Sequence, residues 1–104
     1  MALYLLEIKR GYPKKVQMAT MNVNGMDALR RHAIREFLTK EGKISVWKLN
    51  RDGSKKLMGI VMYSSFAERP VWGTRKESTR NNTTYVKLIL HNIDPGTGKI
   101  GKGW

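Results

Sequence analysis

One segment of this chain, residues 26–41, repeats its apolar residues with the period of an α-helix. The apolar stripe of that segment consists of Met26, Leu29, Ala33, Ile34, Phe37 and Leu38. We expect Asn24 to cap the amino end, Asp27 to interact with the first-turn amides, and Gly42 to follow as the left-handed terminator. Because so short a helix is marginal alone in water, its stripe must pack against another layer of the fold.

Most segments around this helix are rich in apolar and aromatic residues and are bounded by turn signals, which is typical of β-strands. Strands are expected at residues 2–9, 15–23, 43–50, 55–64 and 85–93, with a tight Asp-Gly turn between the third and the fourth. Residues 71–72 fit a short strand or an anchored loop, and residues 99–104 fit a short last strand or a tail. The sequence therefore predicts an α+β fold, in which one helix packs on one face of an antiparallel sheet of about five strands.

The chain has 104 residues and shows neither an internal repeat nor a linker, so we expect one domain over residues 1–104. Residues 74–84 contain no apolar side chain, which predicts an exposed, mobile loop. The longest uncharged stretches, 16–26 and 57–67, fall far short of the ~20 apolar residues that span a bilayer. The apolar start of the chain has no basic region before it, so we expect a cytoplasmic protein that does not enter a membrane.

The charge of this chain is its strongest functional signal. There are 20 Lys and Arg residues against 8 Asp and Glu residues, which gives a formal net charge of +12. Like charges repel and weaken a small domain, whereas the phosphates of a polyanion offset that repulsion and release counterions on binding. The excess is spread along the sequence and is densest at the expected turns, so it forms a patch only if the fold brings separate turns together.

This reasoning predicts a nucleic-acid interface made of cations and flat rings. The cations expected to contact phosphates are Arg10, Lys14, Lys15, Arg31, Arg35, Lys55, Lys56, Arg75, Lys76, Arg80, Lys99 and Lys102. The aromatic residues expected to stack on unpaired bases are Tyr12, Trp72 and Trp104, each of which lies near cations in the sequence. Trp47 lies in the middle of a strand and is expected in the core. Arg30 falls within the apolar arc of the helix, so it needs an internal carboxylate, for which Glu7 and Glu68 are candidates.

The residue types present exclude several chemistries. The chain has no Cys, which excludes disulfides, cysteine zinc sites and thiol catalysis. Its two imidazoles, His32 and His91, have no cluster of further ligands around them in the sequence, so we expect neither a metal nor a cofactor. The glycine-rich end fails the phosphate-loop pattern, because Ile100 follows Lys99 where that pattern requires Ser or Thr.

The function that these features favour is that of a small, nonenzymatic nucleic-acid-binding module. Single-stranded or structured RNA or DNA is preferred over a duplex, since the exposed face of the single helix is of mixed charge. One alternative is an interaction or inhibitor module that docks an acidic protein or a protein already bound to nucleic acid. A second alternative is a small metal-independent ribonuclease, with His91, Arg75 and Arg80 as candidates for the chemistry. The sequence does not predict an oligomeric state.

Overall fold

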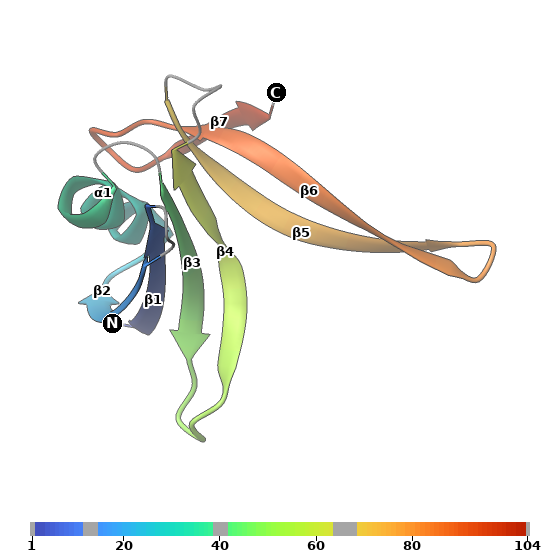
Figure 1. Cartoon of the computed structure of the whole chain (residues 1–104), viewed down its shortest axis with the longest axis horizontal. Helices are drawn as coiled ribbons and strands as arrows, with labels where there is room; N and C mark the ends of the chain where they lie inside the picture. Colours follow the sequence, from blue (N-terminus) through green and yellow to red (C-terminus); the bar gives the residue numbers. More distant parts are fainter. Residues whose placement is uncertain (1, 12–14, 39–41, 64–68, 104) are drawn as a thin grey trace.

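The computed structural model describes residues 2–11, 15–38, 42–63 and 69–103 (Figure 1). The elements are β1 (Ala2–Arg10), β2 (Lys15–Val23), α1 (Met26–Phe37), β3 (Gly42–Leu49), β4 (Lys55–Tyr63), β5 (Pro70–Arg80), β6 (Thr83–Ile93) and β7 (Ile100–Gly103). The strands form one antiparallel sheet in the order β2-β1-β3-β4-β5-β6-β7. The predicted α+β class with one helix is confirmed. The predicted strand number is wrong, because the described sheet has seven strands and not about five.

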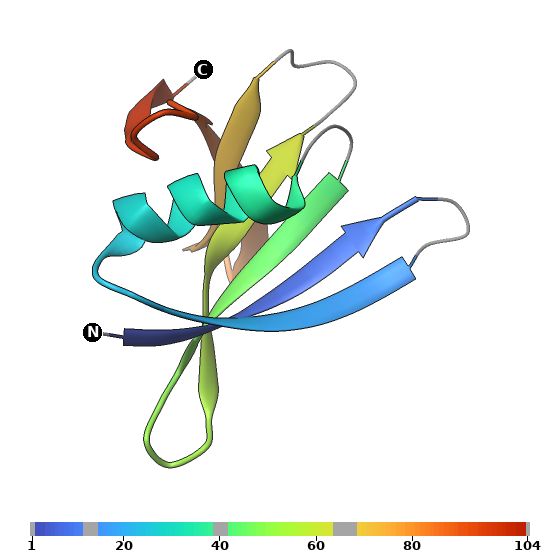
Figure 2. The same cartoon turned by 90° about the vertical axis from the view of Figure 1, so that its left-hand side faces the viewer.

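Helix α1 packs across one face of the curled sheet, as Figure 2 shows. The alternation of β1 places Tyr4, Leu6 and Ile8 on that face, and all three are buried beneath the helix stripe. Ile44 and Val46 of β3 and Val61 of β4 continue the same layer, and their register partners lie on the same face. The main core therefore lies between one helix and the central strands.

The predicted helix ends are wrong in detail. Gly25, with φ +95°, stands at the N-cap where Asn24 was expected, and no side chain caps the helix there. The helix ends at Phe37 with Leu38 as its C-cap, and Gly42 belongs to β3. Glycine accepts the positive φ that this sharp entry into the helix requires, so the backbone geometry and not a capping side chain sets the start of α1.

The turn between β3 and β4 forms at the predicted Asp-Gly pair. The Asp52 carboxylate accepts hydrogen bonds from the Ser54 backbone N–H at 2.9 Å and from the Ser54 hydroxyl at 2.6 Å. These hydrogen bonds stabilise the ionised carboxylate and lower the pKa of Asp52. The register of β3 and β4 shifts next to Gly59, which agrees with the bulge that a strand glycine predicts.

Residues 74–84 do not form the predicted loop. They complete β5 and begin β6, which pair as a long hairpin that projects from the rest of the molecule (Figure 1). Asn81 and Asn82 form its turn with φ values of +51° and +61°, the conformation that joins two strands most tightly. The segment lacks apolar residues because both of its faces meet solvent, and its threonines still favour an extended backbone. The predicted exposure of residues 75–84 is confirmed.

Candidate nucleic-acid interface

Trp72 is not available to stack on bases, which corrects the sequence-based prediction. Its side chain is 4% exposed and belongs to the core. The indole lies against Gly59 so closely that a Cβ at that glycine would stand 2.2 Å from Trp72 Cζ2. The Arg30 guanidinium also lies near this indole, 5.2 Å from its ring centroid. The absence of a side chain at Gly59 therefore makes room for an indole that the sequence alone places at the surface.

Arg30 finds its partners near the amino end of its own helix, and not at the predicted Glu7. Its Nε donates a hydrogen bond of 2.7 Å to the Gly98 carbonyl, and its Nη2 pairs with the Asp27 carboxylate. Glu7 instead pairs with Lys9 at 3.0 Å, and the other candidate, Glu68, lies outside the described residues. Burial lowers the pKa of Arg30, and the Asp27 carboxylate opposes that shift. Arg30 is thus a structural cation that joins α1 to β5 and to the turn before β7.

The predicted phosphate-binding cations do not form one patch. Arg10 and Lys15 lie where β1 and β2 join, whereas Lys99 lies in the turn between β6 and β7 beside an open depression of about 640 Å³. On α1, Arg35 is exposed, but Arg31 is only half-exposed. Lys102 belongs to β7, and its side chain is outside the described part. The sequence-predicted residues Tyr12, Lys14 and Trp104 lie outside the described residues.

The remaining predicted cations are divided between two hairpins. Lys55 and Lys56 start β4 next to the β3–β4 turn, and Lys55 Nζ lies 4.4 Å from the ring centroid of Trp47. Trp47 is half-buried, so it is less enclosed than predicted. Arg75, Lys76 and Arg80 lie on β5, in the projecting part of the β5–β6 hairpin. We call this projecting part, residues 74–89, the arm.

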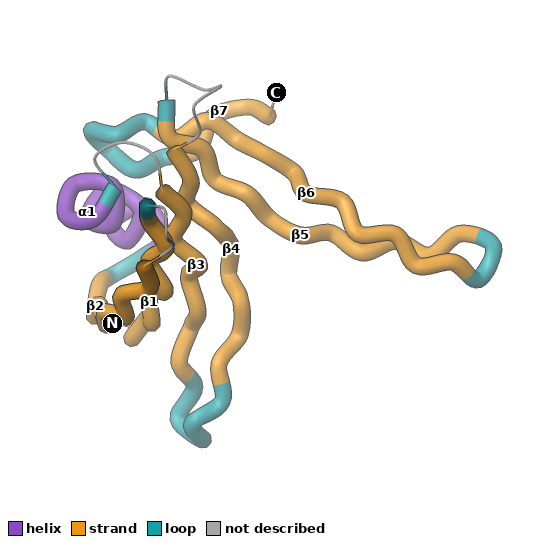
Figure 3. Tube along the Cα trace, viewed as in Figure 1, coloured by secondary structure: helices purple, strands orange, loops and turns teal. Residues whose placement is uncertain are grey.

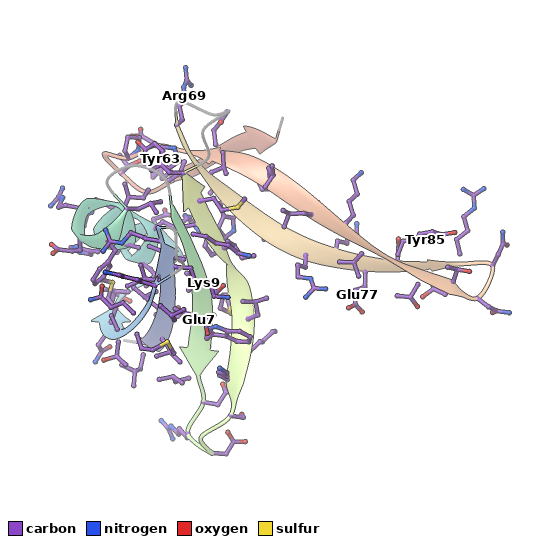
Figure 4. All side chains as sticks on the ribbon, viewed as in Figure 1. Glu7, Lys9, Tyr63, Arg69, Glu77 and Tyr85 are labelled. Carbon is purple, nitrogen blue, oxygen red and sulfur yellow. The ribbon has the colours of Figure 1, made fainter. Side chains whose placement is uncertain are left out.

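The two faces of the arm differ in charge. Cross-strand partners share a face, so the register places Lys76, Ser78, Arg80, Thr83, Tyr85 and Lys87 together. We call this the basic arm face: it holds three cations and no acid. The opposite face carries Arg75, Glu77, Thr79, Thr84, Val86 and Leu88. Figure 4 shows Tyr85 and Glu77 on opposite sides of the arm, as this register requires.

Strands β4 and β5 separate soon after they pair. Their register runs from Tyr63↔Pro70 to Ile60↔Gly73, and beyond Gly73 the arm and the β3–β4 hairpin diverge (Figure 3). A small cavity of about 80 Å³ lies at the point of separation and is lined by residues such as Leu57, Gly73 and Arg75. The arm is therefore a two-stranded ribbon whose outer part has no third strand among the described residues.

Cations face one another across the described part of the sheet at four places. The directly opposed pairs are Arg10↔Lys15, Lys9↔Lys43, Lys48↔Lys56 and Lys76↔Lys87. Like charges in this arrangement destabilise a sheet, where opposite charges contribute roughly 0.2–1 kcal/mol. Among the described residues the ion pairs are Lys9–Glu7 and Arg30–Asp27, and neither involves a cation of the arm. An anionic partner would relieve the repulsion between Lys76 and Lys87.

The sequence prediction missed Lys87 and Tyr85, which complete the basic arm face. Both lie on the strand predicted at residues 85–93, on the side opposite Val86 and Leu88, so their shared face was visible in the alternation. Their position beside Lys76 could not be predicted, because the pairing of β6 with β5 was not predicted. Tyr85 is 52% exposed and is the exposed aromatic ring of this face.

The residues proposed for ribonuclease chemistry do not meet. His91 pairs with Trp72 at the root of the arm, whereas Arg80 lies at its tip. Arg75 shares its face with Leu88, which the alternation of β6 places opposite the face of His91. The described residues contain no group of three or more His, Cys, Asp or Glu side chains that could hold a metal ion. The helix that the structure describes lacks the length and apolar character needed to cross a membrane.

Comparisons of this chain with protein-family models, with curated proteins and with solved structures give no match.

Proposed function

We propose that this protein is a nucleic-acid-binding module and that the arm supplies its main contacts. The observation that carries the proposal is the basic arm face, on which Lys76, Arg80 and Lys87 are exposed without an acidic residue on the same face. A phosphate backbone bound there would neutralise these cations and release the counterions condensed on the nucleic acid. The Lys76↔Lys87 repulsion that weakens the free arm would then favour the complex.

The other chemical features of the arm support the same partner. Tyr85 offers an exposed ring and hydroxyl beside Lys87, which can stack on an unpaired base or donate a hydrogen bond to a phosphate, roles that the buried Trp72 does not fill. Serine, threonine and asparagine side chains occupy most of the outer arm and give hydrogen-bond donors and acceptors for phosphates and base edges. Lys55 and Lys56, on the neighbouring hairpin, would contact a nucleic acid long enough to reach both projections.

A protein partner is the second candidate, and the edges of the arm favour it. An unpaired strand edge can accept a strand from another protein by backbone hydrogen bonding. An acidic strand added to β5 would also meet the cations of the arm. This candidate predicts weak binding of free oligonucleotides, with no dependence on their length.

Fluorescence anisotropy with labelled oligonucleotides of several lengths tests the proposal. The protein is titrated into single-stranded and duplex probes at 50 mM and 200 mM salt. If a binding site neutralises four or five phosphates, the affinity for a B-DNA duplex falls about 150- to 500-fold over this range, since the slope of log K against log salt is about −0.9 per phosphate. Binding that is weak for every probe, or equal at the two salt concentrations, would contradict nucleic-acid binding and favour the protein partner.

A further inference from the structure

We infer that the arm binds in the major groove of duplex DNA, an inference that rests on the proposed function and specifies its ligand. Its basis is that the arm is a free two-stranded ribbon (Figure 1). Neighbouring strands lie about 4.8 Å apart, and side chains and backbone edges widen such a ribbon to a size that the major groove, about 12 Å wide, admits. The minor groove, about 6 Å wide, does not admit a ribbon without being deformed.

The edges of the arm suit the walls of a groove. Pairing of β5 with β4 ends at Gly73, and pairing of β6 with β7 is confined to His91–Ile93. Both edges of the arm therefore direct unpaired backbone N–H groups outward among the described residues. Phosphates line both walls of a groove and accept hydrogen bonds from such N–H groups. A single strand offers one line of phosphates and would leave one edge of the arm without a partner.

The tip of the arm is built to approach base edges. The Asn81–Asn82 turn is the tightest way to join two strands, so no wide loop blocks entry into the groove. Around it, Ser78, Thr79, Arg80, Thr83 and Thr84 are exposed, and each carries a polar side chain. Arginine and asparagine donate to guanine and adenine edges, which the major groove presents in a distinct pattern for each base pair.

The depth of penetration agrees with the dimensions of B-DNA. Residues 74–80 of β5 extend the arm by about 20 Å at about 3.3 Å per residue. The major groove is about 8.5 Å deep, so the arm can place its tip at the base edges while Lys76 and Lys87 remain near the phosphates. A-form RNA has a deep and narrow major groove that excludes a ribbon, so DNA is the duplex that fits.

A shortened arm tests this inference without changing the charge of the protein. Deleting residues 77–80 and 83–86 removes Glu77 and Arg80 together, so the formal net charge stays at +12. The deletion removes four cross-strand pairs, so the Asn81–Asn82 turn then joins Lys76 and Lys87. Hydrogen-bonded and non-hydrogen-bonded pairs alternate along the hairpin, and four is an even number. Lys76↔Lys87 is therefore a pair of the same hydrogen-bonding type as Arg80↔Thr83, which the turn joins in the full chain. The core residues and the Lys76↔Lys87 pair remain, and thermal unfolding monitored by tryptophan fluorescence verifies the fold.

The full chain is expected to bind a 20-base-pair DNA duplex more tightly than its single strands or the same sequence as duplex RNA. Shortening the arm should weaken duplex DNA binding by about five- to 150-fold, the factor that the loss of one good base contact produces. Single-stranded DNA loses the contacts of Arg80 and Tyr85 but keeps those of Lys76 and Lys87, so its affinity should fall by a smaller factor than that of the duplex. Equal losses for both probes, or none, would overturn the inference.

A second measurement uses the unmodified protein and does not depend on the folding of a variant. Bulky substituents at the 5-position of pyrimidines fill the major groove and should weaken binding, whereas a minor-groove ligand should leave it unchanged. The reverse pattern would contradict the inference. If the full chain binds single strands as tightly as the duplex, this inference fails and the proposed function stands. If it binds neither, both fail.

Discussion

Arg30 and Lys76 are both cations on regular secondary structure, and the molecule treats them in opposite ways. Arg30 lies between the Trp72 indole, the Asp27 carboxylate and the Gly98 carbonyl, so its charge is satisfied within the fold. Lys76 faces Lys87 on an exposed ribbon that carries no acid on the same face. Arg30 therefore joins elements of the body, whereas Lys76 has no carboxylate partner among the described residues. Composition alone makes the two cations equivalent, and only their surroundings distinguish structure from binding.

The largest effect on stability should come from substitution of Trp72, which lies at the root of the arm. Trp72→Ala removes a buried ring from Gly59 and Arg30 and should lower the free energy of unfolding by about 3–5 kcal/mol. Urea denaturation followed by circular dichroism measures it, with Trp72→Phe as a milder control. Unchanged stability together with weaker nucleic-acid binding would show that Trp72 belongs to the interface after all.

Arg30 should follow in size. Arg30→Met keeps much of the side-chain length but removes the hydrogen bonds to the Gly98 carbonyl and to Asp27. Hydrogen bonds to charged groups contribute about 1.5–3 kcal/mol, and we expect a loss of that order in urea denaturation. The matched control is Arg35→Met, an exposed position on the same helix, which should change stability by less than about 0.5 kcal/mol. Equal losses at the two positions would contradict the structural role of Arg30.

Removal of cations from the arm should not lower the free energy of unfolding, in contrast to removal of Arg30. Lys76→Gln/Lys87→Gln removes two opposed charges from exposed positions, so the free energy of unfolding should stay equal or rise by no more than about 0.5 kcal/mol. Thermal unfolding at low salt, where repulsion is screened least, is the sensitive measurement. A clear loss of stability would mean that these lysines support the fold, and the contrast between body and arm would disappear.

The smallest effect concerns Asp52 at the β3–β4 turn. Hydrogen bonds from Ser54 hold the pKa of Asp52 below its unfolded value of about 3.9. Since the folded pKa is the lower one, the contribution to stability is present above the unfolded pKa and is lost as the pH falls through the folded pKa. NMR titration of the carboxyl carbon should report the depressed pKa, and Ser54→Ala should raise it. An unchanged value in that variant would exclude Ser54 as the cause.

Local patterns in the sequence predict much of the body. The period of residues 26–38 identifies α1, and the apolar content of residues 2–9 identifies β1, whose side with Tyr4, Leu6 and Ile8 is the buried one. Residues 74–84 of the arm could not be predicted as strands from the same kind of signal, because residues 75–84 are exposed on both faces. Strand β5 forms because it pairs with β6, and that pairing is set by a turn of two asparagines and by contacts distant in the sequence.

The candidate site likewise combines features that local sequence patterns predict with features that only tertiary contacts determine. The sequence predicted Arg75, Lys76 and Arg80 as contacts to a nucleic acid, but it did not place Lys87 beside Lys76. It assigned Trp72 to the surface because its neighbours in the sequence are polar or glycine. The fold places Trp72 against Gly59, a glycine on another strand, and no local pattern encodes that contact. Residue types predicted the class of partner, whereas tertiary contacts decided which residues are free to meet it.

The salt dependence of duplex binding in two matched charge variants tests the central claim most directly. Lys76→Gln/Lys87→Gln and Lys9→Gln/Lys43→Gln each remove one opposed lysine pair, the first from the arm and the second from the body. The arm variant should make the slope of log K against log salt shallower by about two, because each lost phosphate contact accounts for about 0.9. The body variant should keep the slope of the unmodified protein. Equal slopes in all three proteins, or a loss confined to the body variant, would contradict the account.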